Sequence, residues 1–554
     1  MTLKEIIRKK VLGIAGGLVS EEGSGAEERI SLINDSERIT RQKIQEYNVW
    51  YIGDGDELLN YYTNQTMFNY NYEPYYSRNK KGYFWSVSAT ENDIKRTHSG
   101  QARNIVDTLV GITRFPLIKV TEHGGTKNKV NENLQKILRD CKMKSIYKDE
   151  QMPMTLVEGW GCYKINWDKD VSDYPYPVYY RAENVDFIYK AKKIVGIIYK
   201  DWYTDGKNRK YLLLEIRRTH MQGGVPCLVI ENEIYKVLDG MKDYVKKVEP
   251  EEIKNEVPEL ADIQEYIEIG PTRVLFSEPC MFYKNPDGNQ SGPGRSIFSG
   301  KIDLLDDLDE SLSQATNTVR RSTTIEYFNS EYLERDPATG LPKQPHSYDR
   351  KYSVYAGQRG SSGDVNTNDP VQVTQPNLNF EQYDSHSISV LSQLLTGIMS
   401  PATLGIDIAK KDNALAQREK EKVTIFTRNG IIDSETEILY GLCNQLLMAY
   451  EFMTTGKITV TEYNISIKFS EFADDSYENK LEKLGAAYDS QQISDDMYMS
   501  KLYGDTLSDD EYEKELKWLK ENHTKPRTDG MTGFNGDGFN EEGVNPAEVA
   551  SLIK

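Results

Sequence analysis

Five acidic residues crowd one short stretch of the chain and come closest to a metal-binding pattern. Asp303, Asp306, Asp307, Asp309 and Glu310 lie within "KIDLLDDLDESLSQATNTVRRS". Carboxylates can hold a divalent cation, but no histidine accompanies them as a further ligand. Acids this close together on a helix usually face water, so we expect one solvated acidic face and predict neither a metal nor a cofactor.

Motifs for phosphate binding and catalysis do not appear. The segment "EHGGTKNK" at 122–129 has the wrong order and spacing for a P-loop, and no G-x-S-x-G or H-E-x-x-H occurs. The 37 tyrosines and 6 tryptophans could stack on sugars or bases, but they fit interfaces and a sandwich core better. We therefore predict that the chain is not an enzyme; a nuclease or sugar-active protein that uses these acids and aromatics is the alternative.

The charge of the chain limits how it can meet nucleic acid. The 554 residues carry a formal net charge of −18, with an isoelectric point near 5.1. Neutralisation of phosphates dominates nucleic-acid affinity, so this chain should not grip DNA over a broad face. An acidic wall could still let DNA slide past without sticking. Composition alone does not choose between these two cases.

Compartment signals point to a reducing environment away from membranes. The five cysteines are odd in number and form no C-x-x-C pair, so we expect neither disulfides nor a metal site. The N-terminal apolar run, 11–19, is short and glycine-rich, which favours an amphipathic helix over a secretory signal. No stretch approaches the ~20 apolar residues of a membrane span.

The pattern of elements along the chain predicts an α+β fold. Residues 1–145 show mainly helical spacing. From about 152, short β-branched and aromatic runs alternate with Asp, Asn and Gly turns. This pattern is typical of antiparallel strands, and a sandwich is one fold that such strands form. Acidic helices with Ser494 and Ser508 as N-caps should follow near the C-terminus.

Two helices are predicted on either side of a Pro/Gly-rich insertion, 325–378, which should hold one or two short strands. The second helix lies in "FEQYDSHSISVLSQLLTGIM", where apolar residues again recur every three or four positions. The first helix carries one apolar stripe made of Ile302, Leu305, Leu308, Leu312, Ala315 and Val319.

An apolar loop then runs directly into a charged helix. "GIMSPATLGID" looks exposed, and an exposed apolar loop implies contact with a partner. The helix that follows starts with charge on nearly all sides and becomes apolar from Val423, so its start should lie in water and its continuation in a core. Gly430 permits a bend.

The segment "LLTGIMSPATLGIDIAKKDNALAQREKEKVTIFTRN" closely resembles a segment of tailed-bacteriophage portal proteins, with its S-P-x-T-x-G turn and D-N-A-x-A-Q-R-E-K-E-K helix. A weaker likeness extends through "RKYLLLEIRRTHMQGG". The first 100 residues and the tail are not covered in detail. The resemblance implies a ring subunit, in which twelve copies surround a DNA channel at one capsid vertex.

The resemblance also implies a division of the chain. It would comprise a wing at 1–296, a stem helix at 297–324, a clip insertion at 325–378, a second stem helix at 379–397, a tunnel loop at 398–411, a long spine helix at 412–455, wing strands at 456–472, crown helices at 473–525 and a flexible tail at 526–554.

The tunnel loop of this likeness would face DNA. Its neutral residues would make only weak phosphate contacts, while Lys410 and Lys411 could steer the backbone transiently. The acids of 303–310 would add to the repulsion of phosphate at the stem. The neutral residues are Ser400, Pro401, Ala402, Thr403, Leu404, Gly405 and Ile406.

The partners implied by the resemblance are further copies of the chain, the terminase large subunit, major capsid and scaffold proteins, a head-completion or tail adaptor protein, and double-stranded DNA that passes without sequence reading. The location implied is the portal vertex of a virion, with host cytoplasm during assembly. Another virion structural or scaffold protein, from capsid or tail, is the alternative.

Overall fold

Helices and antiparallel sheets both occur in the computed structural model, which confirms the predicted α+β class. The chain divides into two compact units, Met1–Phe472 and Ala473–Lys554, and each is described by itself. The structure describes residues 30–31, 35–68, 83–86, 94–121, 129–237, 244–260, 263–285, 292–322, 325–329, 333–343, 351–355, 371–374, 380–406, 414–460, 462–470, 484–485, 488, 493–503 and 509–523.

The described N-terminal part is mainly helical, as its periodicity predicts. The predicted amphipathic helix near residue 11 lies outside the described residues. A π-helix, η2, stands between two α-helices, and the 3-10 helix η1 spans Phe84–Ser86. The α-helices are α2 (Asp35–Ile52), α3 (Gly55–Phe68), α5 (Gln101–Thr113), α6 (Lys129–Asp140), α7 (Met143–Ser145) and α8 (Met152–Glu158), and η2 is Ile146–Gln151.

A large antiparallel sheet follows, in the order β1-β9-β8-β7-β6-β5, with β10 also paired to β8. The β7–β8 hairpin turns at Gly223 and Gly224, which both have positive φ, as a two-residue hairpin turn requires. The strands are β1 (Ile30–Ser31), β5 (Val185–Lys190), β6 (Lys193–Thr204), β7 (Lys210–Gln222), β8 (Val225–Val237), β9 (Tyr244–Val248) and β10 (Tyr266–Ile269).

A smaller antiparallel sheet, β11-β3-β4, packs against the large one. It comprises β3 (Gly161–Asn166), β4 (Tyr176–Arg181) and β11 (Ser277–Cys280). Cys162, Phe187 and Tyr199 share one buried cluster between the sheets. Arg217 of β7 donates to the carbonyls of Ile165 at 3.0 Å and Phe276 at 2.6 Å, so a buried guanidinium also joins them. The sheet-on-sheet arrangement fits the expected sandwich.

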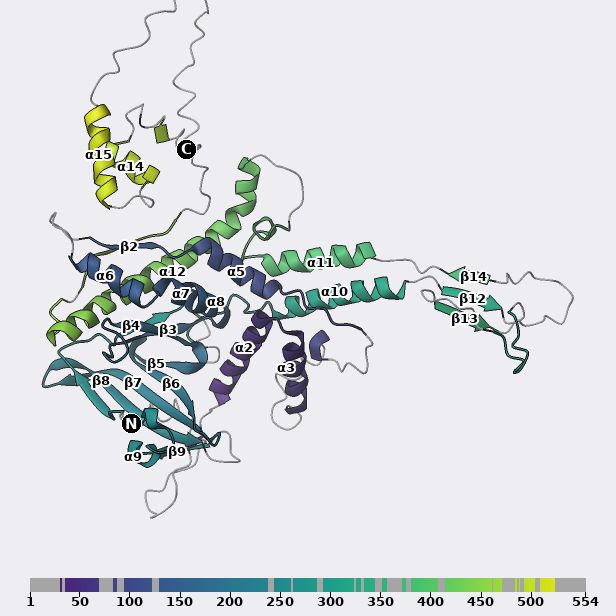
Figure 1. Ribbon diagram of the computed structural model, residues 1–554, viewed down its shortest axis with the longest axis horizontal. Coiled ribbons are helices and arrows are strands. Elements are labelled where there is room, and N and C mark those ends of the chain that lie inside the picture. Colours follow the sequence, from purple (N-terminus) through teal and green to yellow (C-terminus); the bar gives the residue numbers. More distant parts are fainter. Residues whose placement is uncertain are drawn as a thin grey trace, which may run out of the picture. The chain divides into compact units, whose positions relative to one another are not determined.

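Helices α10 (Ile302–Arg321) and α11 (Phe380–Leu395) lie side by side and antiparallel (Figure 1). Lys301 Nζ donates to the carbonyls of Gln393 and Thr396 at 2.9 and 3.1 Å, which places the start of α10 at the end of α11. The predicted stripe of α10 is buried from Ile302 to Ala315, but Val319 is 50% exposed. The chain therefore leaves and re-enters this pair at the same end.

The described residues of the insertion between α10 and α11 contain three strands, where the sequence predicts one or two. The sheet has the order β13-β12-β14, with β12 parallel to β13 and antiparallel to β14. The strands are β12 (Ile325–Asn329), β13 (Lys351–Tyr355) and β14 (Val371–Thr374).

The long helix α12 (Ala414–Thr455) runs without a break through Gly430, and Figure 1 shows a change of direction in its N-terminal part. Its apolar side enters the main core from Ile431 onwards. Strand β15 (Ile465–Lys468) then pairs with β2 (Leu117–Val120), so the end of the first unit returns to its helical N-terminal part.

The second unit contains α14 (Asp495–Tyr503) and α15 (Asp509–His523). The Ser494 Oγ accepts the Met497 N–H at 3.3 Å, which confirms Ser494 as an N-cap. Ser508 and the predicted tail at 526–554 lie outside the described residues.

Candidate functional site

The acidic stretch of α10 does not form one solvated face. Asp303, Asp307 and Glu310 are exposed, but Asp306 and Asp309 are 4% and 0% exposed. The prediction is therefore wrong for the last two, because they lie on the side of α10 that packs against residues 83–86 and 94–99. These residues supply donors for both carboxylates, and neither of them can line a water-filled channel.

Asp309 accepts hydrogen bonds from three groups of these residues. Its Oδ2 accepts from Trp85 Nε1 at 3.0 Å and lies 2.7 Å from His98 Nδ1, and its Oδ1 accepts the Ser99 N–H at 2.8 Å. Ser313, one turn further along α10, accepts the Thr97 N–H at 2.8 Å. A buried carboxylate with this many donors holds the loop before α5 against α10.

Asp306 plays a similar part closer to the start of α10. Its carboxylate accepts the backbone N–H groups of Phe84 at 2.8 Å and Trp85 at 3.4 Å. Burial raises the pKa of Asp306 to about 7, although the two backbone hydrogen bonds oppose that shift. The role of Asp306 is therefore structural.

A polar cleft of about 480 Å³ lies between α10 and α11. The Ser311 hydroxyl is 2.7 Å from His386 Nδ1, so each helix supplies one partner of a hydrogen bond across it. No cluster of acids, histidines and cysteines suited to a metal ion occurs among the residues that the structure describes. The cleft is lined by Asp307, Glu310, Ser311, Gln314, Gln382, Tyr383 and His386.

The predicted tunnel loop is only partly exposed. Ser400 is buried, Pro401 to Leu404 are half-buried in a 3-10 helix (η5), and among the described loop residues, 398–406, only Gly405 and Ile406 are exposed. The expectation of an exposed apolar loop is therefore wrong for Ser400, and it holds at Gly405 and Ile406. Lys410 and Lys411 lie outside the described residues.

Hydrogen bonds to α12 fix the start of this loop. The buried Thr424 Oγ1 accepts the Ser400 N–H at 2.9 Å and lies 2.8 Å from the Thr403 hydroxyl. Gly405 closes η5 with a φ of 73°, a conformation that favours glycine. Leu404 packs against the main core. The loop therefore leaves the core at a defined point, Ile406.

The apolar residues at the start of α12 do not all enter a core. Val423 is 44% exposed and Phe426 is 83% exposed, so the predicted change to a buried helix at Val423 is wrong. Thr424, Thr427 and Arg428 are the buried residues there. Arg428 donates to the Ile112 carbonyl at 2.9 Å and to the Ser470 carbonyl, which joins α12 to the end of α5 and to the chain after β15.

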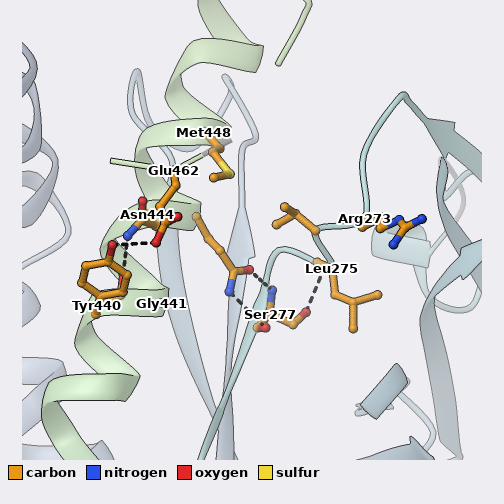
Figure 2. Close-up of a pocket in the computed structure, with 10 residues that line it drawn as sticks. Arg273, Leu275, Ser277, Tyr440, Gly441, Asn444, Met448 and Glu462 are labelled. Carbon is orange, nitrogen blue, oxygen red and sulfur yellow. Dashed lines mark hydrogen bonds between the residues drawn. The ribbon is translucent and has the colours of Figure 1, made fainter. Parts of the chain in front are cut away.

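A shallow pocket of about 370 Å³ lies where α12 meets β11 (Figure 2). Gln445 bridges the two elements: its Oε1 accepts the Ser277 N–H at 2.7 Å and its Nε2 donates to Glu278 at 2.6 Å. Asn444 accepts the Tyr463 N–H at 2.6 Å. These contacts join α12 to β11 and to the chain before β15, and the Tyr440 hydroxyl, which also lines the pocket, donates to Glu462 at 2.8 Å.

Two further glutamates lie inside the joint between α12 and the sheets. Glu435 of α12 is fully buried and accepts Gln151 Nε2 at 2.6 Å. Burial raises the pKa of Glu435 and of Glu278 to about 8, because neither carboxyl has a cationic partner to offset desolvation. Both are therefore neutral at pH 7.

Sequence reasoning missed the groups that hold these elements together. Thr424 lies within the apolar run from Val423 to Phe426, where nothing distinguishes its hydroxyl as an acceptor for Ser400. His98 and Trp85 lie more than 200 residues from Asp309 in the chain. No spacing rule connects such residues. The one usable signal for Asp309 was its place beside the apolar stripe, one residue after Leu308.

None of the helices in the described residues is long and apolar enough to cross a membrane.

Comparisons with known proteins add little. No protein-family model and no curated protein matches the chain. A search of solved structures finds a chain from the "Virion of native gene transfer agent (GTA) particle", which is 11% identical, with a TM-score of 0.32, over 89% of this chain and 96% of that one.

Proposed function

We propose that this chain is the subunit of a portal ring, which forms a channel for double-stranded DNA at one vertex of a tailed-phage capsid. The channel serves DNA packaging and later ejection. It acts as a conduit and a docking platform and carries no catalysis of its own. The proposal rests first on the portal-like segment from Leu394 to Asn429.

The observation that carries the proposal is the way this segment is built. An antiparallel helix pair, α10 and α11, leads through η5 into α12, and Thr424 connects η5 to α12 by hydrogen bonds. A sequence match that arose by chance would not predict hydrogen bonds between the S-P-x-T-x-G turn and the helix that follows it. Here the S-P-x-T-x-G turn and the charged helix form one rigid unit that presents Ile406 to solvent.

The chemistry of the exposed part suits DNA that passes without being held. Gly405 and Ile406 carry no charge, so they offer no strong contact to phosphate. The net charge of −18 disfavours adhesion of DNA elsewhere on the subunit.

The resemblance supplies the proposed partners. The sheet β12–β14 and its connections would dock the terminase large subunit and later the tail or neck adaptor. Major capsid and scaffold proteins would surround the ring at the vertex.

The first experiment measures assembly of the purified full chain. Mass photometry and negative-stain electron microscopy should give closed rings with a central hole; twelve copies of 63.5 kDa would weigh about 760 kDa. Filaments, open sheets or monomers only would overturn the portal assignment, and filaments or sheets would favour another virion structural protein.

The second experiment tests the loop. Ile406→Asp should leave rings intact but reduce DNA packaging or retention in particles built with this protein, because it places a negative charge beside phosphates. Val171→Asp, at a 66% exposed site between β3 and β4, is the matched control and should package normally. Equal packaging by both variants would remove Ile406 from the channel. Leu404→Asp is less suitable, since Leu404 packs against the core.

A further inference from the structure

Four buried side-chain atoms near the middle of α12 make no hydrogen bond in the described part of the chain. They are Glu435 Oε2, Gln151 Oε1, Tyr147 OH and Tyr163 OH. The four residues come from α12, η2 and β3, and all are 1% exposed or less. Burying a polar atom without a partner costs free energy, so native proteins rarely leave several such atoms together.

These four residues lie close to one another. Gln151 Nε2 donates to Glu435 Oε1 at 2.6 Å, which leaves the second oxygen of each side chain unused. Tyr147 and Gln151 both belong to the π-helix η2, four positions apart. Burial raises the pKa of both tyrosines, and Glu435 lies near enough to each hydroxyl to add to that rise once its carboxyl is ionised.

The π-helix is an observation in its own right. Such segments are rare and often mark functional positions, since they shift the side chains of one turn relative to a regular helix. Here η2 carries two of the four unpartnered atoms and faces α12 and the sheet strand β3. The irregular turn thus gathers polar groups where a regular apolar core would be expected.

We propose that Glu435, Gln151, Tyr147 and Tyr163 form an internal hydration site, in which one or two ordered water molecules bridge the four atoms. Buried waters in proteins typically make about three hydrogen bonds to polar groups of this kind. The tyrosine hydroxyls both donate and accept, and Gln151 Oε1 accepts. A neutral Glu435 donates through its O–H, so the four groups can satisfy a water molecule without any net charge.

A neutral ligand fits better than a cation. Of the four side chains only Glu435 is acidic, and no group of three or more acids, histidines and cysteines suited to a metal ion occurs among the described residues, so a cation would meet a single carboxyl here. The inference concerns the joint between α12 and the sheets, and it holds whether or not the chain forms a ring.

The direct test is a density map of the assembled full chain at a resolution that shows ordered water. We expect a peak within about 2.6–3.2 Å of at least three of the four atoms. A map that shows waters elsewhere in the core but no peak here would overturn the proposal.

A double-mutant cycle tests the same site in solution. Tyr147→Phe and Tyr163→Phe each remove one hydroxyl that the structure does not bond to the other. If one water network links them, the fall in the thermal unfolding midpoint of the double variant should differ from the sum of the single falls. Tyr147→Phe with Tyr235→Phe, in the distant sheet cluster of β8, is the control pair and should be additive. Additivity in both pairs would contradict a shared water.

The last arm separates water from a cation. The unfolding midpoints of the wild type and of Glu435→Gln are each measured in potassium chloride, ammonium chloride and choline chloride at equal ionic strength. The difference between the two proteins should be the same in all three salts. A rise with potassium or ammonium that Glu435→Gln abolishes would overturn the neutral site.

Discussion

The Ser400 N–H donates to the buried hydroxyl of Thr424 at 2.9 Å, across 24 positions of the chain. This bond lies at the junction where the 3-10 turn η5 meets the long helix α12. It determines where the loop leaves the core and therefore which of its residues reach solvent.

Thr424→Val should loosen that junction. Valine keeps the shape of threonine but leaves the buried Ser400 N–H without an acceptor, which should cost about 1–3 kcal/mol. Hydrogen exchange should become faster at residues 400–406. Thr436→Val is the control, because the Thr436 hydroxyl bonds only within its own helix, to Ile432 at 2.7 Å. Equal protection of the loop in both variants would contradict the role given to Thr424.

Asp309→Asn should destabilise the first unit by about 3 kcal/mol, since an amide nitrogen cannot accept from Trp85 Nε1 and His98 while its oxygen accepts from Ser99. Guanidinium unfolding followed by tryptophan fluorescence, to which Trp85 contributes as one of six tryptophans, measures this loss. Asp307→Asn, at an exposed position two residues earlier, should change the midpoint little. If the two variants unfold alike, the hydrogen bonds of Asp309 contribute less than their burial indicates.

Two glycines of α12 should respond in opposite directions to alanine. A Cβ at Gly441 would overlap with the Glu278 carboxyl, so Gly441→Ala must displace that carboxyl from its hydrogen bond with Gln445 and should lower the unfolding midpoint. A Cβ at Gly430 meets nothing within 4 Å, so Gly430→Ala should gain up to about 1 kcal/mol from helix propensity. Thermal unfolding measures both, and a stabilising Gly441→Ala would show that the contact with β11 is looser than described.

The buried glutamate Glu435 should make stability fall as pH rises. Its pKa is about 8 in the folded protein and near 4.5 in the unfolded chain. Between these values the unfolded chain releases a proton that the folded protein keeps, which removes up to roughly 1.4 kcal/mol of stability per pH unit. Glu278, whose pKa is also raised to about 8 by burial, adds an effect of the same sign.

Glu435→Gln should therefore flatten the decline of the unfolding midpoint between pH 5 and pH 8. Glu437→Gln, an exposed glutamate two residues along the same helix, should follow the wild-type curve. Parallel curves for wild type and Glu435→Gln would mean that Glu435 is already ionised in the folded protein.

Local patterns in the sequence were sufficient for the elements. The stripe from Ile302 predicts α10, the spacing around Leu394 predicts α11, and the glycine pair at 223–224 predicts the β7–β8 turn. Each signal involves residues within a few positions of one another, where backbone geometry alone decides which side chains share a face. The portal-like segment could also be recognised from the sequence, because its residues are contiguous.

Burial was decided by the tertiary structure. A charge pattern describes a helix surface but not what covers it, and the sequence does not distinguish Asp306 and Asp309, which residues 83–86 and 94–99 cover, from the exposed Asp307. Phe426 shows the reverse case, an apolar residue that the described part of the chain leaves 83% exposed. Contacts between residues hundreds of positions apart depend on how whole elements pack, so the sequence alone determined the elements and their order, and only the packing decided which polar groups hold them together.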